Sequence, residues 1–415
     1  MATVTNSKIR ADLLQVEVSN NSARSAPAAN PTPHDSRAFP AGHLGLRQYQ
    51  PAFSRIIGEK PTQSLLFSTA DTSRIRFFHG GCVYVHERDE IYTMSDLLPT
   101  ANSSLLPSIV MSRISVKVRG VEAEGDRHPD AEARPHVLSA EWAKLRPPAN
   151  MPMPAGACAQ TDGILFCSQG NLTPGTGGVY YMPLGRQPVA VVTNFAGRPF
   201  NSLQGITCDK GSGLWFTDSD RGHLHGIRPK PELRSQVYRY DTATGDLRVV
   251  ADGLGRPSAL VLSPDGQTMY ITDVESQGMD GTFDQALYVI RCRRQMHSEY
   301  VLTGYLVSFT YRAATIYAYD VVQRSGGVFL ANKRVFAYAA KGVPSAVACD
   351  SVGNVYAACG DGVEVWSAGG LALGLLMVPG GCSGICFGRD NELFVCTGQA
   401  LWRVQLNNIK GEGEG

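Results

Sequence analysis

The sequence lacks the features that would assign it to several large classes of protein. No apolar segment approaches the roughly 20 residues that span a bilayer, and residues 1–30 contain no apolar core of a secretory signal. With 38 basic and 37 acidic residues the net charge is only +1, and no lysine- or arginine-rich run occurs. We therefore expect no membrane span and no nucleic-acid partner, and in the absence of a signal the chain is cytoplasmic by default.

Motifs of several common active sites are also absent. There is no Gly-x-Ser-x-Gly elbow, and the glycine-rich stretch at residues 173–178 lacks the Lys-Ser/Thr and the helix of a phosphate loop. The 10 cysteines match no zinc-binding spacing. Most of them lie in predicted strands, where a free thiol packs as a small apolar side chain. A Cys158–Cys167 disulfide across one hairpin is the main alternative.

What the sequence does contain is a hairpin that recurs six times. In each copy a turn of small residues leads into a short strand and then into a second strand rich in aromatic residues. The residues that open the copies are Gly80, Ala155, Gln204, Ser258, Ser345 and Ser383. Such a repeat is typical of propellers and solenoids, and no long amphipathic helix interrupts it. The predicted fold is all-β: a six-bladed β-propeller with a disordered N-terminal arm, whose blades present equivalent residues to the axis.

Composition divides the chain into three parts. Residues 1–45 are rich in Pro, Ser, Asn and Ala, which predicts a flexible arm. The propeller is expected over residues 46–410, with blade strands beginning near Ser64, and residues 411–415 form a tail. Within the propeller, residues 119–150 predict a long inter-blade loop. Residues 286–311 are an atypical insertion, either a lid or an artefact of gene prediction such as a translated intron.

Several long segments carry a resemblance to a known family. They include FHGGCVYV, LFCSQGNLTPGTGGVYY, ADGLGRPSALVLSPDGQTMYITD and CGDGVEVWSAGG, within roughly residues 60–408. On these segments the chain resembles the SMP-30/gluconolactonase/lactonohydrolase family, in particular its fungal branch. The resemblance implies a six-bladed propeller that hydrolyses lactones with a divalent ion at its axis. In that family a Glu of the first blade and an Asn and Asp of later blades hold the ion.

The positions that would hold this ion differ in the present sequence. Gly80 stands where the family has its first-blade Glu, Gln204 replaces an Asn of the third blade, and Ser258 replaces an Asn of the fourth. Asp273 is the only family ligand position that keeps its identity. Because Ca²⁺ takes about six to eight oxygen ligands, we expect no cofactor, with a weakly held divalent cation such as calcium as the alternative.

The remaining polar residues near the axis define the predicted site. Gln204 would orient a carbonyl group, His79 would act as acid or base, and Asp273 would accept a hydrogen bond. Each residue also has a structural alternative. Gln204 could support the wall of the central channel, His79 could pack between blades, and Asp273 could accept hydrogen bonds from the amides of a turn. The polar loop over residues 218–223 is predicted to be a structural turn. The predicted substrate-binding residues are Asn201, Ser258 and Ser345.

A propeller funnel without a metal cage predicts chemistry that needs no metal. Fungal proteins that the chain resembles act as hetero-Diels–Alderases, which join a tropolone or quinone methide to a sesquiterpene alkene such as humulene. The resemblance implies an enzyme of secondary metabolism that holds two apolar partners together and polarises an oxygen. The alternatives are a metal-dependent lactonohydrolase of the gluconolactonase type and a non-catalytic binding propeller. In every case the expected partner is a small hydrophobic metabolite.

Overall fold

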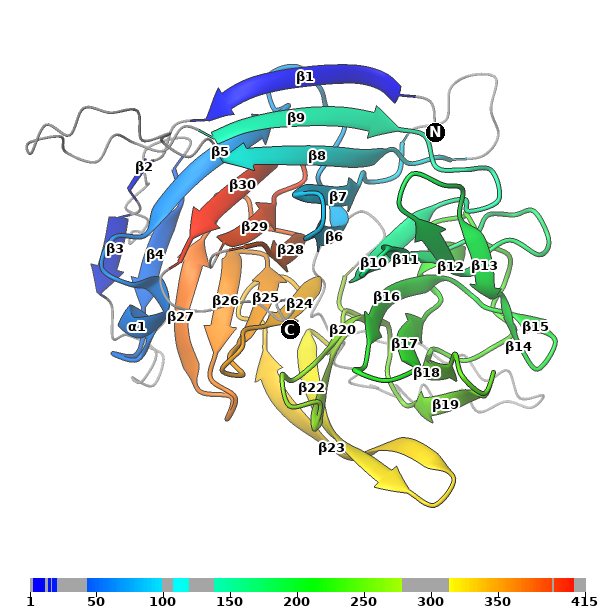
Figure 1. The fold of residues 1–415 in the computed structure, drawn as a ribbon. Helices are drawn as coiled ribbons and strands as arrows, with labels where there is room; N and C mark the ends of the chain where they lie inside the picture. Colours follow the sequence, from blue (N-terminus) through cyan, green and yellow to red (C-terminus); the bar gives the residue numbers. More distant parts are fainter. Residues whose placement is uncertain are drawn as a thin grey trace, which may run out of the picture.

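Six blades, built mainly from antiparallel strands, surround a common axis (Figure 1). The structure is a computed structural model that describes residues 3–11, 14–15, 17–20, 43–98, 107–118, 138–277, 313–389 and 392–406. The innermost strands of the six blades contact one another in a closed ring, each touching the next in chain order and the last touching the first. The predicted all-β six-bladed propeller is therefore confirmed.

Each blade is built from successive hairpins, with extra strands at some outer edges. The first blade contains β6 (Gly80–Val85), β7 (Glu90–Met94), β8 (Met111–Val118), β9 (Leu138–Leu145) and β1 (Thr3–Ala11). The second contains β10 (Pro154–Gln160), β11 (Gly163–Ser168), β12 (Gly178–Pro183) and β13 (Val189–Val192). The third contains β16 (Leu203–Cys208), β17 (Gly213–Asp218), β18 (Gln236–Asp241) and β19 (Leu247–Ala251).

The other three blades follow the same plan. The fourth contains β20 (Pro257–Leu262), β21 (Thr268–Asp273), β22 (Thr315–Arg324) and β23 (Gly327–Tyr338). The fifth contains β24 (Ala346–Cys349), β25 (Val355–Cys359), β26 (Gly362–Trp366), β27 (Ala372–Met377), β4 (Gly45–Gln48) and β3 (Glu17–Asn20). The sixth contains β28 (Gly384–Phe387), β29 (Glu392–Cys396), β30 (Ala400–Gln405), β5 (Thr62–Ser68) and β2 (Leu14–Gln15).

Little of the described chain lies outside the blades. β14 (Asn194–Phe195) and β15 (Arg198–Pro199) form a separate small hairpin, and the described helices are α1 (Phe53–Ile57) and α2 (Arg221–Leu224). No helix in the described ranges is long and apolar enough to cross a bilayer.

The ring is closed by pairing the two ends of the propeller. β5 pairs antiparallel with β30 over residues 62–68 and 400–405, so an early segment supplies a strand of the last blade. The expected strand near Ser64 is thus confirmed, and it belongs to the sixth blade rather than the first. Because closure lets the first and last blades hold each other, it gives the ring cooperative stability that an open array of blades would lack.

The predicted inter-blade loop over residues 119–150 is wrong for its second half. Residues 138–145 form β9, which pairs with β8 and buries Ala140, Trp142 and Leu145. The apolar positions of this strand were obscured by the charged residues between them. Residues 119–137, the insertion at 286–311 and the tail at 411–415 lie outside the described residues. Within the segment predicted to be an arm, β1, β2 and β3 extend three blades.

The aromatic strand of each repeat lies second in its blade and is buried on both faces. Every residue of β11, β17 and β29 is buried, and the core side chains include Phe166, Phe216 and Phe394. These strands read as continuous apolar runs because a neighbouring blade covers each face. Full burial of such a side chain is worth about 1.5–3 kcal/mol, so the blade interfaces supply the core.

The nine described cysteines are all free thiols. The Cys158–Cys167 disulfide considered from the sequence is not formed, because Leu165 and not Cys167 is the cross-strand partner of Cys158. The Sγ atom of Cys158 lies instead 3.2 Å from that of Cys208 on the next blade.

Candidate functional site

The innermost strands enclose a cavity of about 380 Å³ on the propeller axis. This volume falls within the range of small-molecule sites. Its lining includes all of the residues that open the six repeats: Gly80, Ala155, Gln204, Ser258, Ser345 and Ser383. The prediction that equivalent residues of successive blades converge on the axis is therefore confirmed.

Glycines beside the opening residues allow the blades to approach this closely. A Cβ atom at Gly81 would collide with the carbonyl oxygen of Ala155, and one at Gly156 with that of Gln204. A Cβ atom at Gly205 would likewise collide with the carbonyl oxygen of Ser258. The missing side chain of Gly205 is thus a packing requirement in the third blade.

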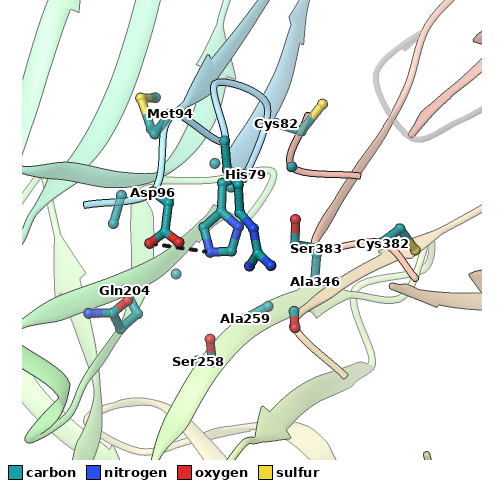
Figure 2. Close-up of a pocket in the computed structure, with 18 of the residues that line it drawn as sticks. His79, Cys82, Met94, Asp96, Gln204, Ser258, Ala259, Ala346, Cys382 and Ser383 are labelled. Carbon is teal, nitrogen blue, oxygen red and sulfur yellow. Dashed lines mark ion pairs between the residues drawn. The ribbon is translucent and has the colours of Figure 1, made fainter. Parts of the chain in front are cut away.

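The most chemically informative pair in the cavity is His79 and Asp96 (Figure 2). His79 precedes β6 and is positioned by its backbone N–H, which donates to the carbonyl of Met94 at 3.0 Å. Asp96 follows β7, and its backbone N–H donates to the carbonyl of Arg76 at 2.9 Å. One hairpin therefore holds both side chains, with Nε2 of His79 4.0 Å from Oδ1 of Asp96.

The electrostatic environment keeps His79 neutral near pH 7. Burial lowers the pKa of His79 below its ordinary value of 6.5, Asp96 opposes that shift, and Arg221 and Arg76 lower the pKa further. Burial, followed by Arg221, lowers the pKa of the neighbouring His225 to about 4. A neutral imidazole can accept a proton, which is the property required of a general base.

Gln204 lies on the cavity wall, but its NH₂ group is already engaged. Nε2 of Gln204 donates to Oε1 of Gln169 at 3.1 Å and to Oγ of Ser202 at 3.0 Å. Its carbonyl oxygen has no hydrogen-bond partner among the described residues. Gln204 is therefore arranged to accept a hydrogen bond from a ligand, rather than to donate one to a carbonyl.

Three serines of the cavity lining have hydroxyls without a partner in the described residues. The side chains of Ser258, Ser345 and Ser383 line it and make no hydrogen bond within the described ranges. The Oγ atom of Ser383 is in addition fully buried. Figure 2 shows Ser258 and Ser383 around the same space as His79. The hydroxyls of Ser258 and Ser345 are therefore available to a polar ligand, whereas that of Ser383 has no accessible surface.

Two predicted site residues lie outside the cavity lining. The carboxylate of Asp273 accepts the backbone N–H groups of Gly255 and Arg256, both at 2.8 Å. The side chain of Asn201 is buried and bonds to the backbone of Leu233. The structure thus brings together Gln204, His79, Ser258 and Ser345, and it does not bring Asp273 or Asn201 to them.

Sequence reasoning missed four charged or titratable residues of the cavity: Arg76, Asp96, Arg221 and His225. All four lie in connections between strands, where the repeat gives no equivalent position in other blades. The only available signal was their place within a few residues of the ends of the repeated hairpins. The loop over residues 218–223 holds a structural carboxylate in Asp218, as predicted, but its Arg221 reaches the cavity.

The donor set of the cavity does not fit a hard divalent cation. Asp96 is the only carboxylate that the described residues contribute to it, and two arginines line the same space. In the part of the chain that the structure describes, no three His, Cys, Asp or Glu side chains come together as a metal site. Calcium-like ions prefer about six to eight oxygen ligands, several of them carboxylates, which these residues do not supply.

Comparison with known proteins agrees with the architecture. Residues 127–281 match the SMP-30/Gluconolactonase/LRE-like region. The chain is 26% identical to lactonohydrolase oryL of Aspergillus oryzae over 76% of this chain and 63% of that protein. It is 30% identical to lactonohydrolase oryH of the same organism over 43% of this chain and 35% of that protein. The chain is thus related to the SMP-30/gluconolactonase-like family and to fungal lactonohydrolases.

The likeness extends to solved structures at the level of the fold. A gluconolactonase from Xanthomonas campestris superposes with a TM-score of 0.58 and 20% identity, covering 89% of this chain and 99% of that one. The chain spans less than two thirds of the length of either fungal lactonohydrolase it matches.

Proposed function

We propose that the chain is a small-molecule enzyme that opens lactone rings, with His79 taking the role that an axial metal ion has in related hydrolases. The observation that carries the proposal is a neutral, largely buried imidazole facing a carboxylate in the axial cavity. The relatedness to fungal lactonohydrolases supports the same reaction class. The roles proposed for individual residues rest on the geometry of the cavity.

In the proposed reaction His79 accepts a proton from a water molecule. The water oxygen attacks the lactone carbonyl carbon, and the tetrahedral intermediate collapses by breaking the acyl carbon–oxygen bond of the ring. The imidazolium of His79 returns its proton to the departing alkoxide, which leaves a hydroxy acid. Asp96 would orient the ring of His79 and stabilise its charged form, since the 4.0 Å separation can shorten when substrate binds.

Unpaired serine hydroxyls would stabilise the negative charge that forms on the carbonyl oxygen. The hydroxyls of Ser258 and Ser345 can donate to the oxygen that becomes negatively charged when the carbonyl is attacked. Donors fixed in a site with little water stabilise this oxyanion more than water does. The carbonyl oxygen of Gln204 can accept a hydrogen bond from a substrate hydroxyl. These polar groups favour an oxygenated substrate.

Hydrolysis of a panel of five- and six-membered lactones, followed by proton release, tests the proposal. The variant His79→Ala should lose about 10²–10⁴-fold in rate, which is the usual contribution of a general base. His223→Ala is the matched control, because His223 is exposed and does not line the cavity. Equal rates for wild-type protein and His79→Ala, or no turnover of any lactone, would refute the proposal.

A second candidate is the hetero-Diels–Alder reaction between a quinone methide and a sesquiterpene alkene. The small residues Gly80, Ala155 and Ala346 support it, because they leave room for two partners in contact. A hydroxyl donor such as Ser258 could polarise the dienone oxygen. Incubation of the protein with a quinone methide generated in situ and humulene tests it. Protein-dependent formation of one stereoisomer would favour this reaction, and a racemic product at the uncatalysed rate would exclude it.

A further inference from the structure

Arg221 is a cavity-lining arginine with little of its hydrogen-bonding capacity used. It is held by α2, directly after the third blade's second strand, and it lines the axial cavity. Its Nη1 atom donates to Oε1 of Gln277 at 3.2 Å. The side chain makes no ion pair with any described residue. A guanidinium carries five N–H donors, so most of this group remains available.

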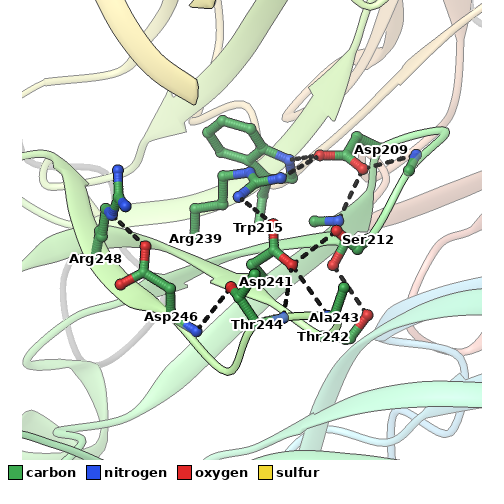
Figure 3. A network of polar contacts seen from close by, with 12 residues as sticks. Asp209, Ser212, Trp215, Arg239, Asp241, Thr242, Ala243, Thr244, Asp246 and Arg248 are labelled. Carbon is green, nitrogen blue, oxygen red and sulfur yellow. Dashed lines mark hydrogen bonds and ion pairs between the residues drawn. The ribbon is translucent and has the colours of Figure 1, made fainter. Parts of the chain in front are cut away.

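Two other arginines of the same blades are paired with carboxylates. Arg256 lies 3.1 Å from Asp220. Arg239 lies 3.2 Å from both Asp209 and Asp241 (Figure 3). Arg221 differs from these two arginines in having no carboxylate partner among the described residues. The difference lies in its position, because Arg239 is remote from the cavity and Arg221 lines it.

The charge balance of the cavity favours an anion. Its ionised lining residues are Arg76, Arg221 and Asp96, which leaves one positive charge in excess when the histidines are neutral. Burial lowers the pKa of Arg221 and proximity to Arg256 lowers it further, while Asp96 opposes both effects. A desolvated cation without a close carboxylate is costly. A ligand carrying one negative charge would remove that cost.

We propose that Arg221, assisted by Arg76, binds a carboxylate group of the substrate. The planar fork of a guanidinium matches a carboxylate through two parallel hydrogen bonds. This inference rests on the proposed function for its reaction and adds the class of substrate, a lactone that carries a free carboxylate. Asp96 lies beside His79 and would repel a carboxylate placed near the imidazole. The substrate is thereby oriented with its acid group at Arg221 and its ring at His79.

Binding of a non-hydrolysable analogue tests the carboxylate site separately from catalysis. The probe is 3-oxocyclopentane-1-carboxylate, with its methyl ester as the neutral comparison, titrated by calorimetry. Wild-type protein should bind the acid at least about 10-fold more tightly than the ester, the scale of one charge-assisted pair. Arg221→Gln should abolish that preference, and Arg221→Lys should keep part of it. Equal affinity for acid and ester in the wild type would overturn the proposal.

Controls separate loss of the site from loss of the fold. Arg74→Gln removes a positive charge from an exposed position outside the cavity and should leave the preference intact. If Arg74→Gln weakened binding as much as Arg221→Gln does, long-range charge would explain the effect and the site would be refuted. A thermal melt of each variant verifies that Arg221→Gln remains folded, and the partial retention by Arg221→Lys provides a folded, charged comparison.

The turnover of matched lactones then distinguishes failure of the site from failure of the reaction. With 5-oxotetrahydrofuran-3-carboxylate as substrate, Arg221→Gln should raise KM at least about 10-fold and leave kcat within a few-fold. His79→Ala should bind the analogue normally and fail to hydrolyse the lactone. Binding that depends on Arg221 without any hydrolysis would sustain the carboxylate site and refute lactone opening. Hydrolysis of acid and ester lactones with the same KM would sustain lactone opening and refute the carboxylate site.

Discussion

The polar residues at the two ends of the repeated hairpin make different contacts. Those at the strand ends accept hydrogen bonds from backbone amides, and those at the hairpin openings line the cavity. Asp218 ends β17 and accepts the backbone N–H groups of Asn201 at 2.9 Å and Ser202 at 2.6 Å. Asp273 ends β21 and holds the equivalent loop of the next blade in the same manner. Ser258 and Ser383, at the openings of two hairpins, line the axial cavity with no partner in the described ranges.

This difference separates residues that build blades from residues that serve a ligand. A carboxylate whose oxygens are occupied by backbone amides is part of the fold, because its removal leaves buried donors unpaired. A cavity hydroxyl without a partner, or a guanidinium with most of its donors unused, contributes nothing comparable to stability. The ends of the hairpin should therefore respond differently to substitution, in stability at one end and in activity or binding at the other.

The largest effect on stability should follow removal of a strand-end carboxylate. Asp218→Ala leaves two buried N–H groups unpaired, each costing about 1–3 kcal/mol, so the free energy of unfolding should fall by about 2–6 kcal/mol. Asp218→Asn keeps an acceptor oxygen and should lose less. Chemical denaturation measures both. A loss below about 1 kcal/mol in Asp218→Ala would contradict the structural role.

The same carboxylate should make stability depend on pH. Burial raises the pKa of Asp218 from 3.8 to about 7, although the amide donors and Arg228 favour its charged form. Because the folded state binds the proton more tightly than the unfolded state, protonation of Asp218 adds stability that is complete below pH 3.8 and is lost as pH rises to about 7. Asp218→Asn should remove that part of the pH dependence in the same denaturation experiments.

Substitution of two glycines at the axis by alanine should have different effects on stability, both smaller than the effect of Asp218→Ala. At Gly205 a Cβ atom would meet backbone atoms of the fourth blade, whereas at Gly80 it would meet nothing within 4 Å. Gly205→Ala should therefore destabilise the propeller by about 1–3 kcal/mol, the usual cost of overpacking. Gly80→Ala should leave thermal stability almost unchanged. Equal melting temperatures for the two variants would show that the blades do not approach as closely as the structure has them.

The pH profile of activity should report on His79. The neutral imidazole is the active form, so activity falls as pH drops through the pKa of His79, which burial and two arginines hold below 6.5. Asp96→Asn removes the one neighbour that raises this pKa, and should move the acidic limb to lower pH. Asp71→Asn, on an exposed turn, is the control. If the acidic limb of the pH profile were at the same pH in Asp96→Asn as in the wild type, the pairing of Asp96 with His79 would be contradicted.

The smallest effect is expected at Gln204. Its NH₂ group is used within the protein, so only its carbonyl oxygen can contact a ligand. Gln204→Leu should raise KM several-fold, in line with about 1 kcal/mol for one neutral hydrogen bond, and change kcat little. Initial rates over a range of lactone concentrations measure it. A loss of more than about 100-fold in kcat would place Gln204 in the chemistry itself.

The ring of residues that open the hairpins could be predicted from the sequence, but the cavity residues that lie in the connections between strands could not. Ser258 and Ser345 could be assigned to the axis because a repeated hairpin places equivalent positions at equivalent radii. Asp273 could not be placed, since a side chain at a strand end can turn either to the axis or to nearby amides, and it does the latter. Arg221 and Asp96 lie in connections that vary between blades, so periodicity carried no information about them.

The order of strands around the ring could be predicted only in part, because local sequence patterns do not show which distant segments pair. β5 occurs before the first repeat in the sequence but completes the last blade in space, which is a long-range pairing that local patterns do not encode. β9 follows a charged stretch and alternates buried Ala140 and Trp142 with polar residues, so a short amphipathic strand was read as part of a loop.

The most direct test of a propeller that opens lactones without an axial metal is turnover by metal-stripped protein. Protein dialysed against a chelator, with its metal content verified by elemental analysis, should hydrolyse a lactone with the same kcat/KM as untreated protein. His79→Ala should be inactive in both preparations. Activity that disappears on chelation and returns with Ca²⁺ or Zn²⁺ would contradict the role of His79 and restore the metal-dependent mechanism.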